Sequence, residues 1–251
     1  MRTHRFFREG AFAERFAAPL LAAAVAGSVL AGCSYRGDID NPATIKATWF
    51  SYLNGDDIRS TCVEGAPLHY RLIYNADYDK QVRSYEVIGD TSGGGAQLTV
   101  RVAGESGLDV TKLRFDDPLA FARWTRSDAP LGASVVERLD RELEASGAFA
   151  PAPEGLQLFS KETYWISNLC RDGVYSFNAW RYPSERFDAI RFDDLLFALD
   201  ETGVAVREPV AVPLGTAARL RSPQGRQAED ATGNFFNVKV GDNGLIGNLA
   251  L

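Results

Sequence analysis

The sequence predicts an α+β fold, in which a mainly antiparallel, twisted β-sheet packs against one or more amphipathic helices. Successive short segments between residues 69 and 103 alternate apolar with polar residues and are separated by turn-forming residues. A second region, residues 163–182, has the pattern of a β-hairpin and is rich in aromatic residues. Residues 131–146 repeat their apolar positions with the period of a helix.

The segment that opens the predicted domain supports two interpretations. Asn41 followed by Pro42 is typical of a helix start, whereas residues 48–52 are rich in β-forming residues. We expect a strand over residues 47–53. A short helical turn should follow over residues 56–62, because acidic residues favour the first turn of a helix.

Three alternating segments predict an antiparallel meander: residues 69–75, 81–88 and 98–103. The glycine-rich residues 91–95 lack the Gly-Lys-Ser/Thr ending of a phosphate-binding loop and stand between two strands. We therefore interpret them as a hairpin loop. Further strands are expected at residues 109–115 and 119–125.

A helix is predicted from Pro130 or Leu131 to Ser146, and Gly147 should end it. The face opposite its apolar stripe mixes acidic and basic residues, which favours a solvated surface helix over a partner-binding one. Residues 148–155, rich in Ala and Pro, are interpreted as a surface connection inside one domain.

The aromatic hairpin comprises strands at 163–170 and 174–182 around a turn at 171–173. Alternate residues of a strand face opposite sides of the sheet, so we expect some of its aromatic side chains to lie outside a single core. Four of them are predicted to form a binding surface: Trp165, Tyr175, Trp180 and Tyr182.

The remaining sequence contains two apolar segments, a long polar stretch and a final hairpin. The apolar segments are residues 187–199 and 204–207, and residues 213–233 are expected to form a long mobile loop. Residues 234–240 alternate again, and a turn should connect them to a last strand at 245–251.

The N-terminal residues have the organisation of a secretory signal. A segment of net charge +2 precedes an apolar run of 17 residues from Phe16 to Gly32. The run ends in Leu30-Ala31-Gly32-Cys33, which resembles the lipobox of bacterial lipoproteins. An uncleaved membrane helix is the rival interpretation, but the run is shorter than the roughly 20 residues that span a bilayer.

The resemblance, which covers residues 1–33 only, implies cleavage after Gly32 and attachment of lipid to Cys33. Ser34 follows where an Asp would retain such a protein in the inner membrane, so the resemblance implies an outer-membrane protein that faces the periplasm. The chain is then divided into a signal peptide at 1–32, a lipidated tether at 33–42 and a single α+β domain at 43–251.

Charge limits the partners of the mature chain. The signal peptide contains four of the 27 basic and two of the 33 acidic residues, so 23 basic and 31 acidic residues remain, with a net charge of −8. A chain this acidic is not expected to bind nucleic acid, nor to adhere electrostatically to anionic headgroups. The predicted attachment to a membrane is therefore through the lipid anchor.

The cysteines indicate a disulfide. Cys33 is used by the lipid, which leaves Cys62 and Cys170 as an even pair in a compartment where disulfides form. We expect them to be bonded. The alternatives are two buried free thiols and, after that, a catalytic thiol, for which only His69 could serve as the base.

No catalytic motif is evident in the mature sequence. His69 is its only histidine, and adjacent acids at 56–57, 116–117 and 193–194 are interpreted as helix caps or turns. Neither a cofactor nor a metal is predicted.

We expect a non-enzymatic, lipid-anchored envelope protein that binds an envelope protein or a cell-wall component, or supports assembly. The alternative is a carboxylate-based cell-wall hydrolase, which needs a cleft with two acids about 5 to 10 Å apart. A carrier of apolar ligands would need an enclosed pocket.

Overall fold

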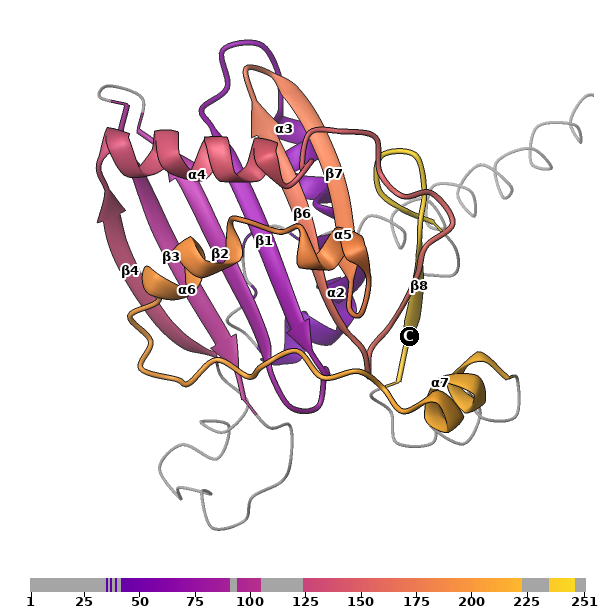
Figure 1. Cartoon of the computed structure of the whole chain (residues 1–251). Helices are drawn as coiled ribbons and strands as arrows, with labels where there is room; N and C mark the ends of the chain where they lie inside the picture. Colours follow the sequence, from indigo (N-terminus) through magenta and orange to yellow (C-terminus); the bar gives the residue numbers. More distant parts are fainter. Residues whose placement is uncertain are drawn as a thin grey trace, which may run out of the picture. The chain divides into compact units, whose positions relative to one another are not determined.

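A six-stranded antiparallel sheet lies at the centre of the fold, and the predicted α+β class is confirmed (Figure 1). Its strand order is β4-β3-β2-β1-β6-β7. The strands are β1 (His69–Ala76), β2 (Val82–Gly89), β3 (Ala96–Ala103), β4 (Thr125–Leu131), β6 (Thr163–Arg171) and β7 (Val174–Arg181). Three shorter strands form a second sheet in the order β5-β8-β9: β5 (Gln157–Phe159), β8 (Asn237–Val240) and β9 (Leu245–Ile246).

The computed structural model describes only part of the chain: residues 35, 37, 39, 42–90, 94–104, 124–222 and 235–246. The expected signal peptide, Cys33 and the expected strand at 109–115 lie outside these residues, as does nearly all of that at 119–125. Residues 35–251 belong to one unit of the fold.

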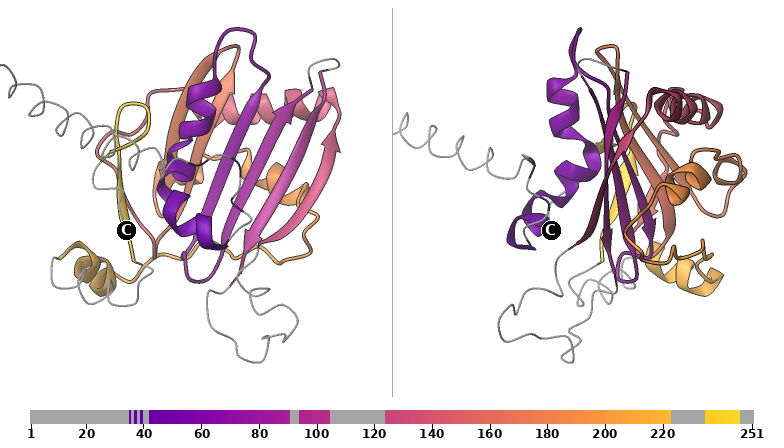
Figure 2. Two further views of the ribbon diagram at one scale, coloured as in Figure 1. Left: turned by 180° about the vertical axis from the view of Figure 1, so that it is seen from behind. Right: turned by 90° about the vertical axis from the view of Figure 1, so that its left-hand side faces the viewer.

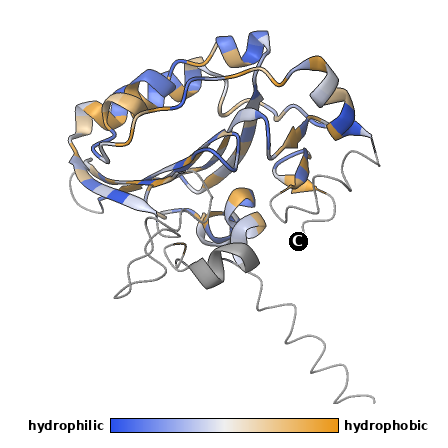
Figure 3. Ribbon diagram, turned by 90° about the horizontal axis from the view of Figure 1, so that it is seen from below, coloured by the Kyte–Doolittle hydropathy of each residue, from blue (hydrophilic) through white to orange (hydrophobic). Residues whose placement is uncertain are grey.

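Helices cover both faces of the large sheet, as the side view in Figure 2 and the view from below in Figure 3 show. On one face lie α2 (Pro42–Asn54) and α3 (Asp56–Thr61). On the other face lie α4 (Ala133–Ala145), α5 (Glu185–Asp188) and α6 (Asp193–Ala198). The sheet is therefore the middle of three layers.

Each face of the sheet has its own hydrophobic core. In β1, Tyr70, Leu72 and Tyr74 contribute to the core under α4 and α6, whereas Ile73 contributes to the core under α2. This follows from the alternation of side chains along a strand. Because both faces are covered, seven of the eight residues of β1 are buried.

Residues 47–53, predicted as a strand, belong to the helix α2, so that prediction is wrong. Trp49, Tyr52 and Leu53 are all buried, and in a helix this spacing places them on one face toward the sheet. The β propensity of the segment is overridden by this packing. Pro42 is the first helical residue, where its missing N–H does no harm.

Several other elements are confirmed. The meander β1-β2-β3, the helix α4, the hairpin β6-β7 and the helical turn α3 lie where the sequence predicts them, within a few residues. The Asp90 amide donates to the Gly95 carbonyl oxygen (2.9 Å) and closes the connection between β2 and β3, of which residues 91–93 lie outside the described part.

The two apolar segments of the C-terminal third, for which no element was predicted, contain short helical turns at residues 187–199 and neither helix nor strand at residues 204–207. The segment after them differs from the prediction. The predicted loop at 213–233 begins with a helix, α7 (Leu214–Arg221), which buries Ala217 and Leu220. Residues 223–234 of that loop lie outside the described residues.

The predicted disulfide is present. Cys62, directly after α3, is bonded to Cys170 of β6, and their Cα atoms are 5.6 Å apart. The bond fixes the end of the α2–α3 layer to the central sheet.

Candidate functional site

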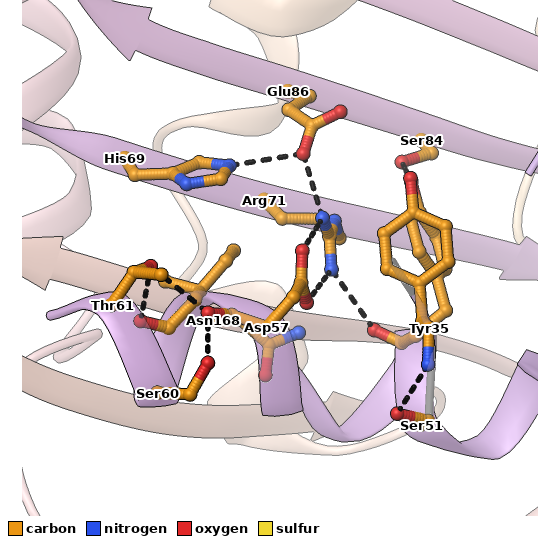
Figure 4. A network of polar contacts seen from close by, with 12 residues as sticks. Tyr35, Ser51, Asp57, Ser60, Thr61, His69, Arg71, Ser84, Glu86 and Asn168 are labelled. Atoms are coloured by element: carbon orange, nitrogen blue, oxygen red, sulfur yellow. Dashed lines mark hydrogen bonds and ion pairs between the residues drawn. The ribbon is translucent and has the colours of Figure 1, made fainter. Parts of the chain in front are cut away.

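Arg71 is the centre of a buried charged network on the α2–α3 face of the sheet (Figure 4). Its side chain is fully buried. The guanidinium donates to both carboxylate oxygens of Asp57, at 2.8 and 2.7 Å, and to Oε1 of Glu86 at 2.7 Å. This two-pronged contact with Asp57 is the geometry that suits a planar guanidinium best.

Glu86 is the anion that Arg71 shares with two other residues. Nε2 of His69 lies 2.9 Å from its Oε1, and Arg101 donates to its Oε2 at 3.1 Å. Burial alone raises the pKa of the Glu86 carboxyl. The Arg71 charge and the hydrogen bonds from His69 and Arg71 outweigh burial and hold that pKa well below its usual range. Glu86 is therefore ionised.

Two tyrosine rings enclose the Arg71 guanidinium. Its central carbon lies 4.0 Å from the centre of the Tyr52 ring and 5.0 Å from that of Tyr35. The Tyr52 hydroxyl is hydrogen-bonded to Ser84, and the Tyr35 amide donates to Oγ of Ser51 at 3.0 Å. Burial raises the pKa of Tyr52 to about 12, although the Arg71 charge opposes this, so the Tyr52 hydroxyl is neutral.

The network joins three parts of the chain that are distant in sequence. Tyr35 comes from the N-terminal segment and Asp57 from α3, and both meet Arg71 in the central strand β1. The two arginines, Arg71 and Arg101, balance the two carboxylates of Asp57 and Glu86. A neutral, hydrogen-bonded cluster of this kind fixes the position of the covering layer on the sheet.

The hydroxyl groups near this network are engaged with the backbone. Ser60 and Thr61 donate to the carbonyl oxygen of Asp57 at 2.8 and 2.9 Å, in the last turn of α3. His69 and Glu86 are paired as in many acid–base sites, but Glu86 also contacts two arginines. The arrangement is suited to holding structure together, and we assign it that role.

This network was not predicted from the sequence. Arg71, Glu86 and Arg101 occupy polar positions of alternating strands, and no role was predicted for them. In the sheet, Arg71 of β1 lies opposite Glu86 of β2. Opposite charges at positions that pair across neighbouring strands were therefore a signal from which the network could have been predicted.

A cavity of about 250 Å³ lies where the end of β1, the start of β6 and α7 meet. Its polar lining consists of Asp77, Lys161, Thr163, Arg207, Thr216 and Arg219. Apolar residues complete it, chiefly Val210, Val212 and Leu220. Among the described residues, three basic side chains and one acidic side chain line this pocket, which makes it basic and partly apolar on an acidic protein.

The pocket wall formed by residues 207–213 is attached to the sheet at three points. The Tyr74 hydroxyl donates to the Arg207 carbonyl oxygen (2.8 Å), and the Arg207 amide donates to Oε1 of Gln81 (2.9 Å). The Val210 amide and carbonyl each lie 3.4 Å from Oγ1 of Thr163. These bonds fix the wall without any ligand.

The structure corrects the binding surface predicted on the aromatic hairpin. Trp165 and Trp180 are 1% and 0% exposed, and both contact Phe192 beside α6. Tyr175 and Tyr182 are half-buried, and the Tyr175 hydroxyl donates to the Asn54 carbonyl oxygen. The hairpin aromatics do divide between two cores, as the alternation predicts, but Trp165 and Trp180 lie inside one of these cores and not on a surface. The two indoles are therefore unavailable to a partner.

The adjacent acids serve local structure. Asp57 binds Arg71, Asp56 accepts from the side-chain amide of Asn54 (2.7 Å), and Asp193 and Asp194 lie in the first turn of α6. Asp116 and Asp117 lie outside the described residues. Within residues 42–90, 94–104, 124–222 and 235–246, no three His, Cys, Asp or Glu side chains are grouped to hold a metal ion.

Comparisons of the chain with known protein families, with curated proteins and with solved structures found no match. Among the helices that the structure describes, none is both long enough and apolar enough to cross a membrane.

Proposed function

We propose that this chain is a lipid-anchored envelope protein with a binding role, held by an acylated Cys33 to the outer membrane and facing the periplasm. The observation that carries the proposal is the position of Tyr35. Its side chain is only 4% exposed, in contact with Tyr52 and Arg71. A single residue, Ser34, separates this buried tyrosine from the cysteine of the lipobox-like motif.

The docking of the N-terminal segment shortens the predicted tether. Ile39, like Tyr35, is buried, so the chain is held by the domain from the second residue after Cys33. Two residues of chain reach at most about 7 Å. A lipid on Cys33 therefore holds the domain directly at the membrane surface, with its orientation set by the Tyr35 contact.

The disulfide supports the proposed periplasmic location. A bond between Cys62 and Cys170 persists in the periplasm and at cell surfaces, whereas thiols in the cytosol are kept reduced. It also accounts for the cysteine count, because only Cys33 remains for the lipid.

The polar groups of the fold favour binding over hydrolysis. The charges around Arg71 neutralise one another inside the protein, and the described residues give the basic pocket one carboxylate, that of Asp77. A carboxylate-based hydrolase needs two acids across a cleft. An envelope protein or a cell-wall component is the class of partner that we propose.

The test is to replace Cys33 with Ser in the full chain and to follow lipid incorporation and membrane fractionation. We expect Cys33→Ser to abolish palmitate labelling and to leave an unprocessed or a released protein, since several acyl chains are needed for stable anchoring. Ser34→Ala is the matched control and should stay acylated and membrane-bound. Palmitate labelling that survives Cys33→Ser would refute the proposal.

A further inference from the structure

We propose that the cavity between the β1 end, the β6 start and α7 binds a small organic anion, a carboxylate or a phosphate monoester with a short apolar group. This inference goes beyond the binding role proposed above, because it adds a small-molecule ligand to the envelope partner. The cavity is remote in sequence from Cys33, so anion binding can be tested independently of the lipid anchor.

The charges of the pocket point to an anion. Among the described residues, the charged members of its lining are Lys161, Arg207 and Arg219 on the basic side and Asp77 on the acidic side. Lys161 forms an ion pair with Asp79 outside the lining, which holds its ammonium group in place and offsets part of its charge. Guanidinium and ammonium groups in one cavity are the donors that recognise carboxylate and phosphate oxygens, the former in a two-pronged manner.

The neutral part of the lining points to an amphiphilic ligand. Val210, Val212 and Leu220 contribute apolar side chains to the lining, and Thr163 and Thr216 also belong to it. A volume of about 250 Å³ lies below the roughly 300–1,000 Å³ of pockets that take drug-sized molecules. The ligand should therefore be small, with an acidic head and a short hydrocarbon part.

The pocket is formed in advance of binding. Gln81, Tyr74 and Thr163 hold the backbone of the 207–213 wall against the sheet. A site whose walls are already fixed loses little conformational entropy on binding, and this raises the affinity for a small ligand.

The experiment is isothermal titration calorimetry of the purified full chain with hexanoate and hexyl phosphate, in a low-salt buffer free of other carboxylates and phosphates. We expect a Kd of about 1 mM or tighter for at least one anion, because charge and apolar contact act together. Neutral 1-hexanol should bind at least about tenfold more weakly. A preference between the two anions would identify the head group.

Arg207→Gln is the decisive variant, since it removes one charge and leaves the backbone contacts of residue 207 in place. We expect the Kd to rise by about tenfold, the loss of one charge-assisted contact. Arg138→Gln, an equal charge change on exposed α4, should bind as the wild type does. Raising the salt concentration should also weaken anion binding by the wild-type protein. This second measurement requires no substitution.

The inference is overturned if neither anion binds below about 10 mM, if hexanol binds as well as hexanoate, or if Arg207→Gln and Arg138→Gln behave alike. None of these outcomes depends on Cys33. If no anion binds but Cys33→Ser loses palmitate labelling, the anion site is refuted and the proposal of a lipid-anchored envelope protein stands.

Discussion

Replacing Arg71 with Met should destabilise the fold strongly, because it removes the shared cation of a buried network. The variant leaves Asp57 and Glu86 without the three hydrogen bonds that Arg71 donates to them. Removing one partner of a buried ion pair typically costs about 3–5 kcal/mol. Glu86 keeps Arg101 and Asp57 is partly exposed, so we expect about 3–4 kcal/mol of lost unfolding free energy.

The effect should depend on pH with a definite sign. In the wild type, Arg71 holds the folded-state pKa of Glu86 below its ordinary value of 4.5, so Glu86 stabilises the fold above about pH 4.5. This contribution is lost as the pH falls toward the folded-state pKa. In Arg71→Met, Glu86 stays buried but lacks the positive charge that lowers its pKa most. The variant should therefore lose less unfolding free energy on acidification than the wild type does. The stability difference between the two proteins should narrow on acidification.

Urea unfolding followed by tryptophan fluorescence measures both effects, because Trp49, Trp165 and Trp180 are buried. Arg138→Met is the matched control: its side chain is 58% exposed and 3.8 Å from Glu142, so we expect a change within about 0.5 kcal/mol. A loss under about 1 kcal/mol for Arg71→Met at pH 7, or one equally large at about pH 4, would refute the reasoning.

Two further predictions concern the contacts beside the disulfide. Gly173→Ala should destabilise the fold more than Gly203→Ala, as measured by thermal unfolding. Both glycines have positive φ (75° and 72°), but a Cβ on Gly173 would lie 2.6 Å from the Glu64 amide nitrogen, whereas nothing lies within 4 Å of one on Gly203. Reduction of Cys62–Cys170 should cost roughly 4–5 kcal/mol, because the bond closes a loop with a sequence separation of 108. Equal urea midpoints with and without reductant would contradict the second prediction.

Most of the sheet and the helix α4 could be predicted, because their periodicities are long and their turns are marked, whereas the strand β4 was missed. Strands β1 and β3 alternate over whole segments, and Gly147 follows α4 at the predicted place. The helix α2 could not be predicted from propensity. Its buried residues Trp49, Tyr52 and Leu53 do follow helical spacing, so periodicity was the better guide there.

The candidate sites depend on contacts between distant segments, which a single sequence does not contain. The pocket joins Lys161 to Arg207 and Arg219, residues that no local motif connects. The network at Arg71 depends on α3 covering that face of the sheet. The disulfide was the exception, because compartment and cysteine parity were enough to predict it.

The edge strand β4 has features that oppose self-association of the protein. It is the outermost strand of the large sheet beside β3, and such edges offer unpaired backbone groups to other chains. Pro130 within β4 has no N–H to donate, and Arg126 and Asp128 place a charged pair 2.8 Å apart on the same strand. A foreign strand added here would lose a hydrogen bond at the proline and crowd the charged pair. At the high local concentration that the proposed lipid anchor would produce, this edge should protect the protein from edge-to-edge aggregation.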